Sequence, residues 1–266
     1  MGSLAPGVAA LMAERLFCLP QRRPLRQHER DFLATGERLD VPHLGSRLAA
    51  WRWGPAGAPT ALLVHGWSSH AGRFAVLGPA LVALGWRVVT YDNPAHGASP
   101  GSRSSLPQFA AALRAVADAV GGVRVAVGHS LGGAAIAVAL RDGLALERAV
   151  LLAAPADPPQ FAERFTEYLH IPGHVGDAMR RNLERRFRRR WADFHIPSVV
   201  AAHRTPVLVV HDEDDPDVLV GEGRAIAAAW PGAELQLTSG LGHHAVVRDP
   251  AVVARVAAFL GAPAAS

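Results

Sequence analysis

The sequence predicts an α/β fold with a mostly parallel, doubly wound central sheet. Short apolar segments alternate with helix-like segments along most of the chain, which is the pattern of a parallel sheet covered by helices on both faces. The chain has 266 residues, half of them hydrophobic, so it can bury one large core. We therefore predict a single domain that spans residues 1–266.

The first part of the chain, residues 1–45, is predicted to be a helical extension of this domain. The apolar stretch Leu4 to Leu19 is interrupted by Glu14 and Arg15, and no basic segment precedes it. We therefore expect an amphipathic helix that docks on the domain, with Pro20 to Arg26 as a connector, rather than a signal peptide. No run of about eighteen apolar residues occurs, so no transmembrane segment is expected.

Six segments are predicted to be strands because each is short and largely apolar, and most of them are rich in β-branched residues. They are residues 60–64, 87–92, 123–127, 149–154, 206–211 and 234–238. Helices are expected at about residues 72–84, at 133–141 and at 251–260. Asp249 and Pro250 fit the start of the last helix, as N-cap and first helical residue.

One serine stands at the junction between a predicted strand and a predicted helix. The segment Gly128-His129-Ser130-Leu131-Gly132 follows the strand at 123–127 and leads into the helix at 133–141. In such a tight turn the serine backbone is strained, and glycines are needed where strand and helix cross closely. The helix N-terminus then points at the hydroxyl and stabilises negative charge there. Ser130 is therefore the candidate nucleophile.

Two more turns, both upstream, complete a recognisable order of motifs. The strand at 60–64 runs into His65-Gly66-Trp67, and the strand at 87–92 ends in the turn Asp92-Asn93-Pro94-Ala95-His96-Gly97-Ala98-Ser99. Together with the serine turn, these motifs resemble the α/β-hydrolase superfamily, in its serine esterase and lipase-like branch with a short helical cap. The resemblance covers about Ser46 to Leu260. His65 and His96 are expected to brace their turns rather than take part in chemistry.

The resemblance implies a catalytic triad in the chain order serine, acid, histidine. After the strand at 206–211 the chain reads Asp212-Glu213-Asp214-Asp215-Pro216-Asp217, and the family's Gly-x-x-Asp pattern places the acid at Asp215. Asp212 stands where the family has glycine, and Asp212, Asp214 and Asp217 are alternatives. The extra carboxylates are expected to form a solvated loop that caps the next helix. A calcium loop is disfavoured because its central glycine and distal glutamate are missing.

The base is expected in the turn after the last strand. The segment Ser239-Gly240-Leu241-Gly242-His243-His244 resembles the family's Gly-x-Gly-His turn, which maps the base onto His243. His244 is the alternative and is expected to face the cap or solvent. The resemblance also implies an oxyanion hole formed by the backbone N–H groups of Leu131 and Trp67.

About fifty residues separate the strand at 149–154 from the strand at 206–211, and the resemblance implies a helical cap over about residues 156–204. Met179, Leu183, Phe187, Trp191 and Phe194 fall on one stripe of a helix. We expect Met179 to Phe194 to be largely helical and to cover the mouth of the site, with Phe187 and Trp191 facing the substrate. The arginines of this segment should face outward. The alternative to solvated arginines is a basic face that attracts anionic substrates or a membrane surface.

These observations predict a serine hydrolase that cleaves a carboxylic ester, or a related acyl bond, through an acyl-enzyme intermediate. A cofactor-free haloperoxidase-like enzyme, a C–C bond hydrolase and a non-catalytic binding protein on the same fold remain alternatives.

We expect a small-molecule ester substrate, no cofactor and no metal. The formal charge of +4 is modest, so no nucleic-acid partner is expected. Cys18 is the only cysteine, which excludes an internal disulfide and fits a cytoplasmic location. The sequence leaves the oligomeric state open.

Overall fold

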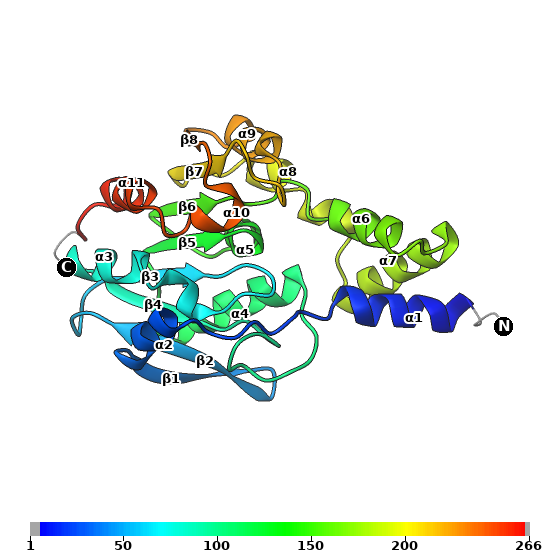
Figure 1. Cartoon of the computed structure of the whole chain (residues 1–266), viewed down its shortest axis with the longest axis horizontal. Helices are drawn as coiled ribbons and strands as arrows, with labels where there is room; N and C mark the ends of the chain where they lie inside the picture. Colours follow the sequence, from blue (N-terminus) through cyan, green and yellow to red (C-terminus); the bar gives the residue numbers. More distant parts are fainter. Residues whose placement is uncertain (1–5, 264–266) are drawn as a thin grey trace.

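The computed structural model describes residues 6–263 and contains one eight-stranded sheet with the order β1-β2-β4-β3-β5-β6-β7-β8 (Figure 1). The pairs β1–β2 and β2–β4 are antiparallel, and every other neighbouring pair is parallel. The strands are β1 Glu37–His43, β2 Ser46–Trp53, β3 Thr60–Val64, β4 Arg87–Tyr91, β5 Val125–His129, β6 Arg148–Leu152, β7 Val207–Asp212 and β8 Glu234–Thr238. The predicted mostly parallel sheet is confirmed.

Helices cover both faces of this sheet. They are α1 Pro6–Phe17, α2 Gln27–Ala34, α3 Leu77–Ala83, α4 Leu106–Ala119, α5 Leu131–Arg141, α6 Gln160–Tyr168, α7 Gly173–Phe187, α8 Ile196–Val200, α9 Val220–Ala229, α10 Gly242–Ala245 and α11 Pro250–Leu260, with 3₁₀ helices η1 Ala71–Phe74 and η2 Trp191–Phe194. One apolar core lies under α4, α5, α8 and α9, and a second lies under α3 and α11.

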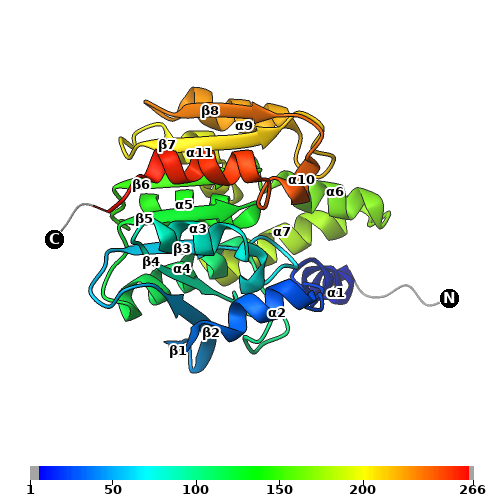
Figure 2. The same ribbon diagram turned by 60° about the vertical axis from the view of Figure 1, so that its left-hand side comes forward.

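Alternation along the central strands explains these two cores. In β3, Leu62 and Val64 belong to the first core, whereas Ala61 and Leu63 belong to the second. All residues of β3, β5 and β7 are buried, as expected for parallel strands that are covered on both faces. Figure 2 shows α11 lying across the face that it covers.

The N-terminal region differs from the predicted helical extension over residues 1–45. Its last part forms β1, which pairs along its whole length with β2. Leu44 and Gly45 both have positive φ, which is the geometry of a tight two-residue turn between antiparallel strands. Pairing with β2 therefore prevails over the helical continuation that we expected.

The first helix docks, but its partner is the cap. The predicted helix Leu4 to Leu19 appears as α1, with its first two residues outside the described range, and it packs against α7 (Figure 1). Ala10, Ala13 and Phe17 of α1 share a small apolar cluster with Met179 and Leu183. Together α1, α6 and α7 project from the sheet at the same end of the molecule.

Two predicted helices are interrupted. The segment 72–84 forms η1 and then α3, which begins at Leu77 and has Pro79 in its first turn, where a missing N–H is harmless. The expected helix from Met179 to Phe194 ends at Phe187 because Arg188 adopts a left-handed conformation with φ of 53°. The chain resumes as η2, where the Glu184 carboxylate accepts the Trp191 backbone N–H at 3.0 Å. Within the described residues, no helix is both long and apolar enough to cross a membrane.

Candidate active site

Ser130 occupies a strained turn between β5 and α5. Its backbone has φ of 53° and ψ of −126°, a conformation that L-residues rarely adopt. The flanking glycines allow this turn because an added Cβ at Gly132 would lie 2.2 Å from the Val64 carbonyl oxygen. At Gly128 an added Cβ would lie 2.5 Å from the backbone nitrogen of Gly133. The hydroxyl therefore stands at the carboxyl edge of the sheet, at the N-terminus of α5.

Asp215 and His243 are brought together from the loops that follow β7 and β8. His243 Nδ1 lies 2.8 Å from Asp215 Oδ2, and the other carboxylate oxygen accepts the Asp217 and Val218 N–H groups at 2.9 Å each. Burial raises the pKa of the Asp215 carboxyl. The hydrogen bonds from His243 and from these amides outweigh burial, so the pKa lies below its usual value. Asp215 is therefore an anion that can orient the imidazole.

His129 places this pair beside the serine turn. Its Nε2 lies 2.8 Å from the His243 carbonyl oxygen, and the two imidazole rings are 4.9 Å apart between centroids. Among the described residues, no hydrogen bond joins the Ser130 hydroxyl to His243. Such bonds often form only when substrate is bound. His244 is half-exposed, with Nε2 3.9 Å from Asp217.

Asp212 is not the solvated carboxylate that we expected. It is fully buried, and its two oxygens accept four hydrogen bonds. The donors are the N–H groups of Asp214 at 3.1 Å, Leu241 at 3.1 Å and Gly242 at 2.9 Å, and the Thr238 hydroxyl at 2.7 Å. Asp212 therefore ties the Asp215 loop to the His243 loop. The acidic segment also does not cap α9, whose N-cap is Leu219 without a side-chain hydrogen bond.

Replacing Asp212 by asparagine should lower the free energy of unfolding by about 2 kcal/mol. The NH₂ group would take the place of one carboxylate oxygen, and it cannot accept the hydrogen bonds that this oxygen accepts. Burial raises the pKa of Asp212, but its hydrogen bonds outweigh burial and hold it below the usual 3.8. A lowered pKa stabilises the fold above that value and loses its effect as the pH falls below it. The difference between wild type and variant should therefore shrink from pH ~7 to pH ~3 in urea titrations. Asp217→Asn, at an exposed side chain, is the control.

The amides expected to form an oxyanion hole lie on either side of Ser130. Trp67 follows Gly66, whose Cα is so close to the serine that an added Cβ would lie 2.8 Å from Ser130 Cβ. Leu131 is the first residue of α5. Neither amide has a hydrogen-bond acceptor within the part of the chain that the structure describes. Both N–H groups are therefore available to a ligand oxygen beside Ser130.

His65 and His96 hold the turns that surround this edge. His65 Nε2 accepts the Asn93 N–H at 3.0 Å, and His96 Nε2 accepts the Ser68 N–H at 3.0 Å. Burial lowers the pKa of both imidazoles, that of His96 to about 4. Both rings are therefore neutral acceptors near pH 7, which fits the bracing role expected from the sequence.

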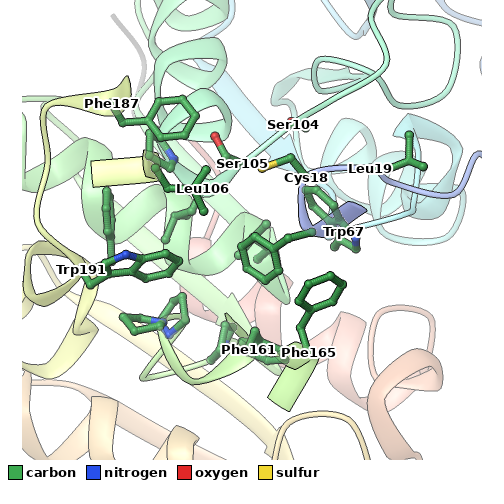
Figure 3. A pocket seen from close by; sticks show the side chains of 18 of the residues that line it. Cys18, Leu19, Trp67, Ser104, Ser105, Leu106, Phe161, Phe165, Phe187 and Trp191 are labelled. Carbon is green, nitrogen blue, oxygen red and sulfur yellow. The ribbon is translucent and has the colours of Figure 1, made fainter. Parts of the chain in front are cut away.

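A cavity of about 510 Å³ opens against Ser130, Leu131 and Trp67. Phe187 and Trp191 line it, as the sequence predicted, together with Phe161 and Phe165 of α6 (Figure 3). The sequence did not predict that residues 16–19 and Gln21 form another part of its wall. Arg189, which was expected to face outward, also lines the cavity and donates to Asp142 at 3.1 Å. Most of the lining is aromatic, aliphatic or proline, so the cavity suits an apolar ligand.

Three imidazoles beside the serine are the group most suited to a metal among the described residues. One nitrogen from each of His129, His243 and His244 lies within 4.8 Å of the others. The ligand nitrogens of a tetrahedral zinc ion lie about 3.3 Å apart, which this limit allows, since each zinc–nitrogen bond is about 2.0 Å. However, Nδ1 of His243 already bonds Asp215, so only Nε2 of this ring is open to a metal. The expectation of no metal stays a prediction.

Comparison with known proteins agrees with this architecture. The family model described as the alpha/beta hydrolase family matches residues 61–256, which is 196 of the 266 residues. The structure of Est1E from Butyrivibrio proteoclasticus with bound ferulic acid is similar, with a TM-score of 0.68 and 19% identity, over 84% of this chain and 97% of that one. Esterase Pf2001 from Pyrococcus furiosus gives a TM-score of 0.70 at 17% identity, over 91% and 96%. Carboxylesterase CesB from Bacillus subtilis gives 0.65 at 17% identity, over 97% and 99%.

Proposed function

Because this chain belongs to the α/β-hydrolase family, we propose that it is a serine carboxylesterase that acts on small apolar esters. One observation carries the proposal. Ser130 lies on a strained turn at the wall of an apolar cavity, and a bonded Asp215–His243 pair lies beside that turn. The esterase structures that share the fold support the same reaction class.

In the proposed mechanism, His243 Nε2 takes the Ser130 hydroxyl proton as the serine oxygen attacks the ester carbonyl carbon. Asp215 keeps the Nδ1–H of His243 pointed away from the serine and stabilises the imidazolium. The N–H groups of Trp67 and Leu131 stabilise the oxyanion, an effect worth about 3 kcal/mol per donor in other serine hydrolases. The imidazolium then gives its proton to the leaving alkoxide. A water molecule, deprotonated by the same imidazole, releases the acid.

The cavity wall indicates the kind of ester. Phe161, Phe165, Phe187 and Trp191 offer apolar and aromatic surface to whichever part of the substrate enters, and Pro155, Pro158 and Pro159 extend it. Binding would bury the apolar group of the ester, while the carbonyl stays at Ser130. We propose a medium-length or aromatic acyl group. A cytoplasmic location stays a prediction. Its basis is that Cys18 is the single cysteine of the sequence, which a reducing compartment permits.

A panel of p-nitrophenyl esters of increasing acyl length tests this function. We expect hydrolysis of every member, with kcat/KM rising from acetate to an intermediate chain length as the acyl group fills the cavity. The haloperoxidase-like and C–C bond hydrolase alternatives would use the same three residues. A folded enzyme that is inactive on all esters but active on a peracid or a diketone would favour one of them instead.

Changing Trp191 to alanine should shift the preference towards longer acyl chains, because it removes a ring from the cavity wall. The variant should lose roughly tenfold in kcat/KM on the preferred ester, while kcat on p-nitrophenyl acetate changes little. Tyr168→Ala is the matched control, since this ring lies on the cap, is 83% exposed and does not line the cavity. An unchanged chain-length profile in Trp191→Ala would show that the ring does not contact the acyl group.

A further inference from the structure

Helix α1 exposes most of its large apolar side chains to solvent and buries a carboxylate. Its inner face, which packs on α7, carries three alanines, Phe17 and one buried carboxylate, that of Glu14. Its outer face carries large apolar side chains that are 47% to 53% exposed. They are Val8, Leu11, Met12 and Leu16, and the stripe continues at Leu19 just beyond the helix. Spacings of three and four residues place these side chains on one face. Apolar stripes of this kind mark interaction sites on folded proteins.

The inner face explains why the helix cannot simply turn its apolar side inward. Ala9, Ala10 and Ala13 let α1 approach α7 closely, and the buried Glu14 carboxylate pairs with the guanidinium of Arg186 on α7. Rotating the helix would break this pair and leave Arg186 without Glu14. The apolar stripe is therefore fixed on the outside of the molecule, where it needs an external partner.

The net charge of the segments that form α1 and the cap indicates what that partner is. Residues 6–26 carry four arginines and one acidic residue, and residues 156–204 carry nine arginines and six acidic residues. These two segments together have a formal charge of +6, so the rest of the chain sums to −2. Arg15 is exposed between Leu11 and Leu16 on the same face. Pairing two copies through this face would bring like charges together, whereas an anionic surface would neutralise them.

The stripe is also continuous with the cavity. Leu16 and Leu19 belong to the exposed stripe and line the same cavity as Ser130. A surface that covers the stripe would therefore lie at the edge of the cavity.

We propose that the outer face of α1 docks this protein on anionic phospholipid membranes. The apolar side chains would enter the boundary between headgroups and acyl chains, and Arg15 on the same face would lie at the headgroups. The docking itself does not depend on the proposed esterase activity. Its consequence for substrate choice, which is delivery of apolar esters from the bilayer to Ser130, rests on the proposed function.

Cosedimentation of the full chain with vesicles tests the docking. We expect binding to vesicles of phosphatidylcholine mixed with phosphatidylglycerol, weaker binding to phosphatidylcholine alone, and a loss of binding as salt rises. Leu11→Glu should lower the partition coefficient about tenfold, because a carboxylate replaces a leucine that would be buried in the interface. Leu44→Glu is the matched control. It makes the same substitution at an 81% exposed leucine in the β1–β2 turn.

Four results would overturn the proposal. The first is sedimentation with neither vesicle, the second is equal binding to both compositions, and the third is binding of Leu11→Glu as tight as that of wild type. A dimer in light scattering that Leu11→Glu dissociates would assign the face to a second copy. Leu11 does not line the cavity, so hydrolysis of p-nitrophenyl acetate should be the same in wild type and in both variants. Loss of vesicle binding with retained hydrolysis therefore separates this proposal from the proposed function.

Discussion

Replacing Ser130 by alanine is expected to reduce ester hydrolysis to the background rate while the fold stays intact. The substitution removes only the hydroxyl, so the turn keeps its Cβ, and Gly128 and Gly132 still allow the close crossing of strand and helix. Without the hydroxyl no acyl-enzyme forms, and in comparable triads the loss of the nucleophile costs about 10⁶ in kcat. The measurement is kcat of the purified variant on the best ester of the panel, with circular dichroism to verify the fold.

Ser68→Ala is the control for this experiment. Ser68 lines the same cavity and also has a positive φ, of 52°, but it lies four residues beyond the end of β3, and its hydroxyl accepts a hydrogen bond from the Gln21 N–H. We expect this variant to keep most of its kcat. If Ser130→Ala keeps more than a few per cent of the wild-type kcat, Ser130 is not the nucleophile.

The second large effect is expected at Asp215. Asp215→Asn should lower kcat by roughly 10³ to 10⁴, because an amide can donate to His243 Nδ1 and would then favour the wrong imidazole tautomer. The low pKa of Asp215 means that the wild-type carboxylate is charged throughout the range in which esterases are assayed. Kinetics at saturating ester measure this loss, and binding of the substrate should change much less.

Two neighbouring aspartates serve as comparisons for this variant. Asp217→Asn alters an exposed side chain and should keep nearly full activity. Asp212→Asn should mainly affect stability, because the carboxylate bonds the two loops rather than the imidazole. A larger loss of kcat in either of these variants than in Asp215→Asn would show that the acid has been assigned to the wrong residue.

Local sequence patterns were enough to predict the framework of the sheet. The six strands expected from apolar runs all occur, with ends that differ by at most two residues, because a buried parallel strand leaves a strong local signal. The serine turn and the start of α11 at Asp249 are likewise local, since Asp249 caps the N–H groups of Ala251 and Val252. The motif order also singled out Asp215 and His243, whose side chains lie 2.8 Å apart in the structure.

What the sequence did not predict depends on contacts between distant residues. The role of β1 follows from pairing with β2, and its residues alone do not distinguish it from a helical extension. Asp212 is buried because Thr238, Leu241 and Gly242 all donate to it from a loop some thirty residues later. Leu16 to Leu19 line the cavity because α1 packs on α7, which no local pattern reveals.

Labelling with a fluorophosphonate probe tests the central claim most directly, because only an activated serine reacts with it at an appreciable rate. We predict that the full chain gains the mass of one probe and that the modified peptide contains Ser130. Ser130→Ala should gain none, and Asp215→Asn should react far more slowly. A folded protein that stays unlabelled, or that is labelled at another serine, would contradict the proposal that Ser130, His243 and Asp215 form a catalytic triad.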